Sequence, residues 1–544
     1  MARLIEATKW ESNMLQNLFR STMLATALLA GGAFTAQALA EVVYNRGNDT
    51  DPKSLDHQLT STVAESHISR DLFEGLVAKN AKGETIPGAA EKWEVSDDGL
   101  KYTFHLRPDG KWSNGDPITS ADFVYAFQRI ENPATAAEYA NILYPIKNAE
   151  KINKNGGKLE EIGAKAIDDH TLEIELEAPT PYFLELLSHH SAYPVHKASV
   201  EKLGSDWTKA GNMVSNGAYT LDSFSPNDKL VLKKNPNFHD AANVKVDVVN
   251  YIPFEDRSAC LRRFEANEVQ SCSDIPTEQM DYMREKLGDQ VHVVPKLGIY
   301  YLPVKGKEGS PLKDVRVRQA ISMIIDRDFL SKDIWRQSML PAYSFVPPGI
   351  NNYTDPVYLP YKDKDILDRE DDAKKLLEEA GVKEGTLSIE LRYNKSENHQ
   401  KTMTAVANML KGVGIASTMV EMEGTGYFDY MKQDQPFDMS RAGWIADYSD
   451  PQNFLFLNQT NNPGFNYPRW SNKEYDGLME QAAKTVNLDD RAKILRQAEE
   501  IFLKEVPAIP VLYYSSNTLV SKNLKGWEDN AIDEHPSRFI SIGG

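Results

Sequence analysis

The chain has 544 residues, and a length of this order corresponds to about three or four folding units. Hydrophobic residues (41%) suffice for large cores and charged residues (26%) are in the usual range, which argues against a disordered, collagen-like or coiled-coil protein. The net charge of −18 at pH 7 repels phosphate backbones, so nucleic-acid binding is an unfavourable hypothesis.

The N-terminal segment has the order of features found in secretory signal peptides. Arg20 precedes an apolar run over residues 23–34, and the small residues Ala38 and Ala40 fit the A-x-A pattern of signal peptidase. The run is too short for a membrane span, which needs about 20 apolar residues. A buried N-terminal helix is the alternative, but the order of the features favours export and a mature chain that begins at Glu41.

Two details qualify this signal peptide. Glu6 and Glu11 are unusual at its front end, and Met14 is an alternative start for translation. No cysteine stands at the cleavage point, so no lipid anchor is expected, and no later segment approaches transmembrane length. The sequence therefore predicts a protein that is free in the periplasm.

Strand-like and helix-like patterns alternate along the rest of the chain, which is typical of the α/β or α+β class. Residues 100–107 and 171–176 alternate apolar and polar side chains with a period of two, as half-buried strands do. The stretch 150–164 is rich in Lys, Gly, Asn and Glu, which predicts an exposed loop. Residues 509–514 have the pattern of an extended strand.

Five segments carry helix patterns. The first is capped by Thr119 or Ser120 and has Asp122 in its first turn. Gly381 follows the third helix as the residue after its last turn, and Pro507 ends the last. The five predicted helices cover residues 119–130, 314–323, 371–380, 475–484 and 490–505.

The chain has two cysteines, Cys260 and Cys272. Export places them in an oxidising compartment, where a pair of cysteines tends to form a disulfide. The loop between them is short, so its entropic stabilisation is at most about 3 kcal/mol. The spacing alone is a weak signal and two unrelated buried thiols are the alternative, but the even count favours the bridge.

Signatures of common enzymes are missing from the sequence, which has no G-x-S-x-G, H-E-x-x-H, Walker A or G-x-G-x-x-G motif. His189, His190 and His196 cluster in a predicted connection between elements, where solvated histidines are commoner than a metal site. Catalytic triads are spatial, so the missing motifs weaken the hypothesis of an enzyme without removing it.

The strongest local feature is the segment 441–451, RAGWIADYSDP, which puts an arginine, a tryptophan and a carboxylate within seven residues. A carboxylate beside an indole can hold a cation, because ionic hydrogen bonds strengthen near a dry aromatic wall. Arg441 can hold a carboxylate through a bidentate contact. A structural ion pair beside a core tryptophan is the alternative, and the residues alone favour it.

Several separated motifs resemble those of the periplasmic oligopeptide-binding proteins of ABC peptide importers, which are bacterial solute-binding proteins of family 5. The resemblance covers about residues 46–541, nearly the whole mature chain. Each motif is weak alone, but their order makes the set specific. The motifs are SRDLFEGL (69–76), KWSNGDP (111–117), TSADFVYAFQR (119–129), VSNGAY (214–219), DVRVRQA (314–320), KLLEEAG (375–381) and PRWSN (468–472).

The resemblance implies an α/β fold of the type II periplasmic binding protein kind, with three domains and two lobes that close on the ligand about a hinge. The ligand would lie between domains I and III. After a signal peptide over residues 1–40, domain I would comprise residues 41–73, 198–297 and 515–544, domain II residues 74–197 and domain III residues 298–514.

The resemblance also implies a peptide site. Asp447 would pair with the N-terminal ammonium of the peptide, and Arg441 would help to hold its carboxylate. The peptide backbone would bind as an added strand, and its side chains would enter hydrated pockets. The residues expected to contact the ligand are Val63, Tyr139, His399, Lys432, Arg441, Gly443, Trp444 and Asp447.

Several positions depart from the family pattern. Ile445 and a position near Gly298 stand where enteric members have two bridged cysteines. Lys432 stands where an arginine is common, and a lysine cannot make the same fork contact. Trp335 replaces a lysine, although Arg336 follows it. These changes leave the preferred length and charge of the peptide open.

The predicted function is that of a monomeric periplasmic receptor without cofactor or catalytic residues. It would capture short peptides and deliver them to the inner-membrane permease subunits of an ABC transporter. Receptors of the same fold for murein peptides, dipeptides, haem or nickel chelates are alternatives within the class. A secreted hydrolase is the alternative from another class, and it would shorten a peptide that a receptor returns intact.

Overall fold

The computed structural model describes residues 41–60, 62–254, 256–273, 275–350, 352–422, 424–462 and 464–543. The predicted signal peptide, with Met14 and the cleavage motif, lies outside these residues. Within the described ranges, no helix has both the length and the hydropathy needed to cross a membrane.

The central element is a nine-stranded mixed sheet that brings together segments far apart in the sequence. Its strands follow the order β17, β12, β18, β11, β1, β10, β9, β8, and β13 pairs with β18 outside this path. β1 lies parallel to β10 and β11, whereas the other pairs are antiparallel. The bounds are β1 Val43–Asn48, β8 Tyr219–Ser225, β9 Lys229–Lys234, β10 Val248–Ile252, β11 Ser271–Ser273, β12 Val291–Pro303, β13 Met339–Pro341, β17 Ala442–Ile445 and β18 Ala508–Val520.

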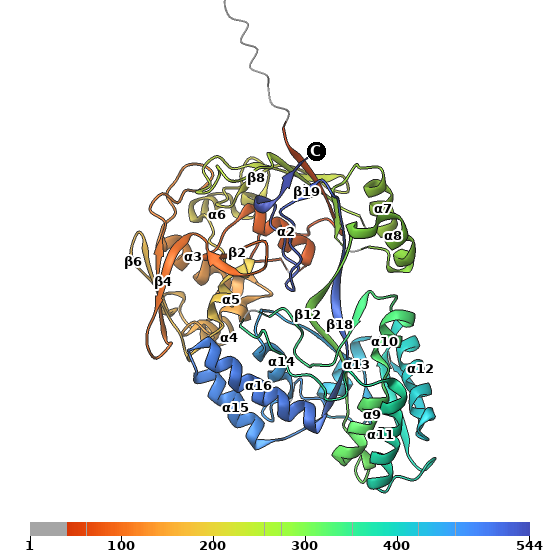
Figure 1. Ribbon diagram of the computed structural model, residues 1–544. Helices are drawn as coiled ribbons and strands as arrows, with labels where there is room; N and C mark the ends of the chain where they lie inside the picture. The colour runs from red at the N-terminus through yellow and green to blue at the C-terminus, as the bar shows by residue number, and fades with distance from the viewer. Residues whose placement is uncertain are drawn as a thin grey trace, which may run out of the picture. The chain divides into compact units, whose positions relative to one another are not determined.

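The two long strands β12 and β18 connect two groups of elements (Figure 1). They pair from Val291 opposite Leu519 to Pro303 opposite Ala508. The register shifts between Pro295 and Ile299, and the stretch of β12 before this shift is only half-buried. The strands therefore pass from one hydrophobic core to another through a less packed middle.

One group, called here the first lobe, has a core formed by buried side chains between Tyr44 and Tyr251 and between Val520 and Ile540. A second, small core around Cys260 and Cys272 adjoins it on β11 and β18. The further elements of this lobe are α2 Val63–Leu72, β2 Val77–Lys79, β3 Thr85–Pro87, β4 Ala90–Val95, β5 Lys101–Leu106, α3 Ser120–Glu131, α4 Ala149–Asn155, β6 Ala164–Asp168, β7 Thr171–Glu175, α5 Phe183–Leu187, α6 Lys197–Leu203, α7 Arg257–Glu265, α8 Met280–Leu287, β19 Leu524–Lys525 and β20 Ser541–Ile542.

The other group, called here the second lobe, has two cores built mainly from residues between Leu297 and Tyr513. It contains a parallel three-stranded sheet in the order β15, β14, β16. Its elements are α9 Val315–Ile324, α10 Arg327–Phe329, α11 Ile366–Glu379, β14 Ser388–Asn394, α12 Glu397–Gly412, β15 Ala416–Met422, α13 Gly424–Lys432, β16 Met439–Ser440, α14 Gln452–Leu455, α15 Lys473–Lys484 and α16 Leu488–Glu505.

The five predicted helices are confirmed as α3, α9, α11, α15 and α16. Their ends could be predicted because capping residues act within one turn of the helix. Thr119 and Asp122 form a capping box at the start of α3, and Asp314 caps α9. α11 begins earlier than expected since Asp365 supplies its cap, and Gly381 follows it at φ 77°. The predicted strands are confirmed as β5, β7 and part of β18.

The prediction of an exposed loop over residues 150–164 is wrong for residues 150–155, whereas residues 156–163 form an irregular connection at the surface. Residues Ala149–Asn155 form α4, which ends at Gly156 in the left-handed region. Ile152 of this helix is fully buried in the core of the first lobe. Ala149 of the same helix is also buried, so two apolar residues dock this short helix, and the polar composition of the stretch hid them.

Cys260 of α7 and Cys272 of β11 form a disulfide. Their sulfurs lie in the small core with Met280 and Met283 of α8. Gly47 in β1 leaves room for the bridge, because a Cβ there would lie 2.5 Å from Sγ of Cys260. The disulfide therefore ties α7 to the main sheet.

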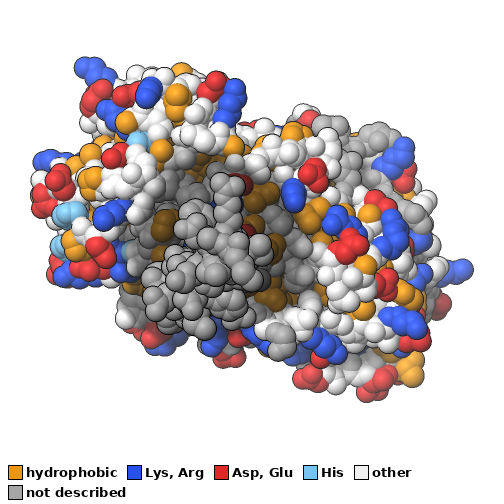
Figure 2. Space-filling view, turned by 90° about the horizontal axis from the view of Figure 1, so that it is seen from above, with side chains coloured by type: hydrophobic (Ala, Val, Ile, Leu, Met, Phe, Trp, Pro, Cys, Tyr) orange, Lys and Arg blue, Asp and Glu red, His pale blue; other side chains and the backbone are white. Residues whose placement is uncertain are grey.

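Lys and Arg side chains are interspersed with Asp and Glu side chains on the face shown in Figure 2. Opposite charges therefore alternate over this part of the described surface, although the whole chain is acidic.

The double variant Cys260→Ala/Cys272→Ala should lose about 2–3 kcal/mol of unfolding free energy, because the unfolded chain regains the freedom of a short loop. Denaturant unfolding with and without reductant measures this loss, and the reductant should change only the wild type. Unchanged stability in the variant would contradict the role given to the bridge.

Candidate ligand-binding site

β17 is the edge strand of the main sheet. It contains Gly443 and Trp444, and Arg441 and Asp447 lie just before and after it. On one side it pairs with β12, where Trp444 lies opposite Ile299 and Gly443 opposite Tyr300. No strand among the described residues pairs with its other side. Such an edge presents backbone N–H and C=O groups to which an extended chain can bind.

Close packing beneath β17 explains why residue 443 is a glycine. A Cβ at this position would lie 2.5 Å from the hydroxyl oxygen of Tyr514 and 3.0 Å from Nη2 of Arg441. Any larger residue would displace one of these side chains. The glycine therefore keeps the strand close to the buried arginine.

Asn453 anchors the segment that follows the strand. Its Oδ1 accepts a hydrogen bond from the indole N–H of Trp444 at 2.9 Å and from the backbone N–H of Asp447 at 3.2 Å. The ring of Trp444 packs edge-on against Phe456 and Phe465. The tryptophan thus holds the turn in which Asp447 lies.

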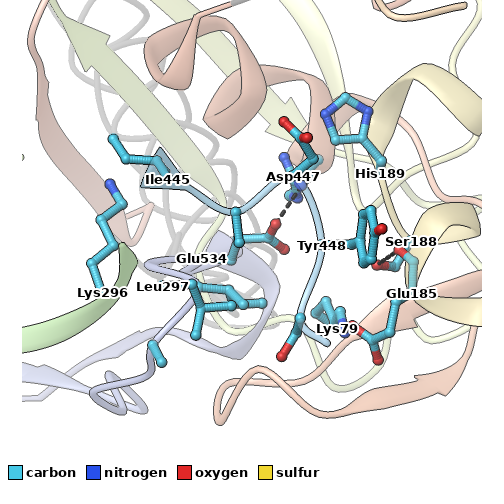
Figure 3. Close-up of a pocket in the computed structure, with 15 residues that line it drawn as sticks. Lys79, Glu185, Ser188, His189, Lys296, Leu297, Ile445, Asp447, Tyr448 and Glu534 are labelled. Atoms are coloured by element: carbon cyan, nitrogen blue, oxygen red, sulfur yellow. Dashed lines mark hydrogen bonds and ion pairs between the residues drawn. The ribbon is translucent and has the colours of Figure 1, made fainter. Parts of the chain in front are cut away.

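The carboxylate of Asp447 lies in a cavity of about 90 Å³ that is lined by residues of both lobes (Figure 3). Three ion pairs contribute to this lining: Arg70 with Glu534, Lys79 with Glu185 at 2.5 Å, and Lys296 with Asp533 at 3.1 Å. Among the charged lining residues that the structure describes, Asp447 is the one without an ion pair or a side-chain hydrogen bond.

The side chain of Asp447 is exposed to water, although neighbouring protein atoms remove part of the hydration of its carboxylate. This desolvation raises the pKa of Asp447 above its usual value. A neighbouring cation would lower that pKa again. Arg441 and Asp447 do not pair with each other, but the same segment contributes a structural ion pair, which Asp450 makes with Arg491.

The prediction of solvated histidines is wrong, because aromatic packing in the first lobe covers them. His190 and His196 are buried, and the ring of His189 lies 4.2 Å from that of His190 and 5.1 Å from that of Tyr139. His189 lines the cavity beside Asp447 (Figure 3). No group of three or more metal-ligating side chains occurs among the residues described.

His189 is neutral at ordinary pH. Burial, and secondarily the charge of Arg70, lower its pKa to about 3. Its Nδ1 accepts a hydrogen bond from the backbone N–H of Ser191 at 3.3 Å, which places the ring proton on Nε2. Tyr139 belongs to the same surroundings, since burial and then the charge of Asp447 raise its pKa.

Arg441 lies in a separate cluster at the other end of β17. Its guanidinium lies 4.8 Å from the ring centre of Tyr300 and donates to the hydroxyl of Tyr514 at 2.6 Å. Its Nε and the hydroxyl of Tyr300 have no hydrogen-bond partner within the described part of the chain, and no carboxylate there pairs with Arg441. It is therefore a buried cation that lacks a counter-charge.

His399 and Trp335 complete this arginine cluster. Their rings lie 5.6 and 6.2 Å from that of Tyr300. Burial, and then the charge of Arg441, lower the pKa of His399 to about 3. The indole of Trp335 donates to Thr402, whereas Arg336 lies apart and pairs with Asp281. The cluster thus has one cation and an aromatic wall.

The remaining predicted residues lie elsewhere. Val63 begins α2 and lines a second cavity of about 510 Å³, which shares Lys296 with the first. Lys432 is exposed at the end of α13, 6.0 Å from the ring centre of Phe465, and lines neither cavity. Gly298 and Ile445 lie opposite each other in β12 and β17.

Sequence reasoning missed several lining residues of the first cavity: Arg70, Lys79, Glu185, Lys296, Tyr448 and Glu534. They come from five separate stretches of the chain. Arg70 and Tyr448 lie in motifs noted above, but nothing local marks them as lining a cavity, and the other four lie in no motif. Charged and aromatic residues are too frequent for their type alone to single them out.

Comparison with known proteins places the chain in a family. Residues 84–466 match the family described as bacterial extracellular solute-binding proteins, family 5. The protein belongs to this family. It is 36% identical over 489 residues to the periplasmic oligopeptide-binding protein OppA of Escherichia coli, and the match covers 89% of each chain.

Solved structures show the same type II periplasmic binding protein fold. An unliganded open form of the murein tripeptide-binding protein MppA matches with a TM-score of 0.87 and 34% identity, covering 93% of this chain and 98% of that one. Haemophilus influenzae OppA in complex with the peptide RPPGFSPFR matches with a TM-score of 0.68 and 33% identity, covering 93% and 99%. The higher score for the open form agrees with a site that water reaches.

Asp447→Asn should leave the melting temperature of the ligand-free protein at pH 7 unchanged or slightly higher, because water screens the charge of this exposed side chain. A carboxyl whose pKa is raised in the folded state costs stability once pH exceeds that pKa, so removing the charge relieves the cost. Any gain should vanish as the pH falls below the unfolded value of about 3.9. Thermal unfolding between pH 3.5 and 7 measures it.

Asp450→Asn is the matched control, because Asp450 is buried and pairs with Arg491 at 2.6 and 2.8 Å. Breaking such a pair costs about 3–5 kcal/mol, so this variant should melt well below wild type. A similar loss in Asp447→Asn would show that its carboxylate has a structural partner.

Proposed function

We propose that this protein is a periplasmic receptor for short peptides with a free N-terminus. It acts as a monomer, catalyses no reaction, and delivers its ligand to the permease subunits of an ABC transporter. The observation that carries the proposal is the unpaired, partly desolvated carboxylate of Asp447 at the end of a free strand edge.

A peptide matches the chemistry of this site at two points. Its ammonium supplies the counter-charge that Asp447 lacks, and charge-assisted hydrogen bonds are roughly twice as strong as neutral ones. Its backbone can add to the free edge of β17 as a further strand. Main-chain bonds do not depend on side chains, so one site can accept many sequences.

The arginine cluster supports binding of the other end of the peptide. Arg441 is a buried guanidinium with unused hydrogen-bonding capacity at Nε, and Tyr300 has an unused hydroxyl beside it. A carboxylate would satisfy both. Because Arg441 directly precedes β17 and Asp447 closely follows it, the two charges mark the two ends of one strand.

Closure of the lobes would complete the site. β12 and β18 join the lobes, and the half-buried stretch around Lys296 is the place where they would bend. In this proposal domain I comprises residues 41–73, 198–297 and 515–544, with domains II and III as 74–197 and 298–514. Val63 and Tyr139 would contact the ligand from the first lobe, and His399 and Lys432 from the second.

Relatives differ in ligand according to their names, which include oligopeptide-binding, murein peptide-binding and probable deoxycholate-binding proteins. Family membership therefore leaves the ligand class open. An unpaired carboxylate favours a cationic end group and disfavours an anionic bile acid. Murein peptides with a free amine meet the same requirement and remain the second candidate.

Asp447→Asn should weaken binding of a free peptide by about two to four decades, because a buried ammonium then lacks its counter-charge. N-acetylation of the peptide should weaken binding to wild type in the same way. Calorimetry with both forms tests this, and chromatography of the recovered peptide should find it intact. Equal affinity for both forms would refute the ammonium site, and shortened peptides would favour a hydrolase.

A further inference from the structure

Tyr182 of the first lobe lies between two residues of the second. Its ring stacks on that of Tyr448, with centres 4.7 Å apart and planes 3° from parallel. The guanidinium of Arg491 lies 5.6 Å from the centre of the Tyr182 ring. The lobes therefore touch at this point as well as through β12 and β18.

The residues that receive Tyr182 form one hydrogen-bonded network, called here the socket. The Arg491 guanidinium donates to both carboxylate oxygens of Asp450, whose Oδ1 also accepts the backbone N–H of Gln452 at 2.8 Å. The hydroxyl of Tyr448 donates to Oε1 of Gln452 at 2.6 Å. Asp450 and Arg491 are buried, whereas Tyr448 is only half-buried and is held within its own lobe by this hydrogen bond to Gln452.

The socket begins at the residue next to Asp447. With no side-chain partner in the described chain, the Asp447 carboxylate is positioned by its backbone alone. That backbone is held by Asn453 through the Asp447 N–H, and by Tyr448 on its other side. Tyr448 is held by Gln452 of its own lobe and by its stack on Tyr182, so one of the two supports of Asp447 is shared with the opposite lobe.

We propose that Tyr182 is a positioning residue for Asp447 and that it makes the ammonium subsite complete before the lobes close. The inference rests on the proposed function. A preorganised site binds more tightly because less freedom is lost on binding. Tyr182 thus acts on recognition of the N-terminus without contacting the ligand.

The far end of the strand has no such support from the first lobe. The side chains around Arg441 in the arginine cluster, which are Tyr300, Trp335, His399 and Tyr514, all belong to the second lobe. In the open protein the ammonium subsite is therefore formed from both lobes, while the carboxylate end is formed from one. It follows that the N-terminus of the peptide binds first and that closure then covers the rest.

The test compares wild type, Tyr182→Ala and Tyr182→Phe, each also in the Asp447→Asn background. Stopped-flow fluorescence measures association and dissociation rates for trialanine and N-acetyl-trialanine up to millimolar concentrations. Tyr182→Ala should reduce the preference for the free form roughly three- to tenfold, mainly through slower association, since an aromatic pair has about this effect. Tyr182→Phe keeps the stacked ring and should keep the preference. In the Asp447→Asn background, Tyr182→Ala should not change the ratio of the affinities for trialanine and N-acetyl-trialanine any further.

Three outcomes separate the hypotheses. If wild type shows no preference for free trialanine, the proposed function fails and the positioning role fails with it. If wild type shows the preference and Tyr182→Ala keeps it, or weakens both forms equally, only the positioning role is overturned. Tyr182→Leu retains bulk without the stack, so it replaces Tyr182→Ala if that variant melts early, and it should show the same reduced preference.

Discussion

An ionised carboxylate without a protein partner is the constraint on which the rest of this site depends. Asp447 is exposed but partly desolvated in the ligand-free protein, and no side chain in the described part of the chain pairs with its carboxylate. The neighbouring charged side chains are all in ion pairs, so Asp447 is the one charged residue of the described cavity lining that lacks a counter-charge. A cation that enters the cavity can therefore pair with the carboxylate of Asp447.

The surrounding structure prevents that carboxylate from forming an ion pair within the protein. Asn453 fixes its backbone, Tyr448 and the socket hold the next residue, and the paired Lys296 and Arg70 are already engaged. At the opposite end of β17 the buried guanidinium of Arg441 likewise lacks a counter-charge, and its Nε has no hydrogen-bond partner in the described chain. A strand edge with a free negative charge at one end and a free positive charge at the other matches the polarity of a zwitterionic peptide.

Local signals in the sequence were sufficient for much of the fold and insufficient for the cavity. Capping residues such as Thr119 and Asp314 marked helix starts, because a cap acts within one turn. α4 was missed since only two of its residues, Ala149 and Ile152, are buried in an otherwise polar stretch. The residues alone favoured a structural ion pair in segment 441–451, which Asp450 forms with Arg491, and resemblance to a family gave Asp447 a ligand-binding role. Its lack of a partner depends on long-range packing, which no local pattern records.

The most direct test of this account is mass spectrometry of the molecules that the purified protein releases on gentle denaturation. The account predicts intact peptides with unmodified α-amino groups, and it predicts that purified Asp447→Asn releases far less of them. A released ligand without a free amine, such as a bile acid, or the same peptides in equal yield from Asp447→Asn, would contradict the claim that the empty charge at Asp447 selects the ligand.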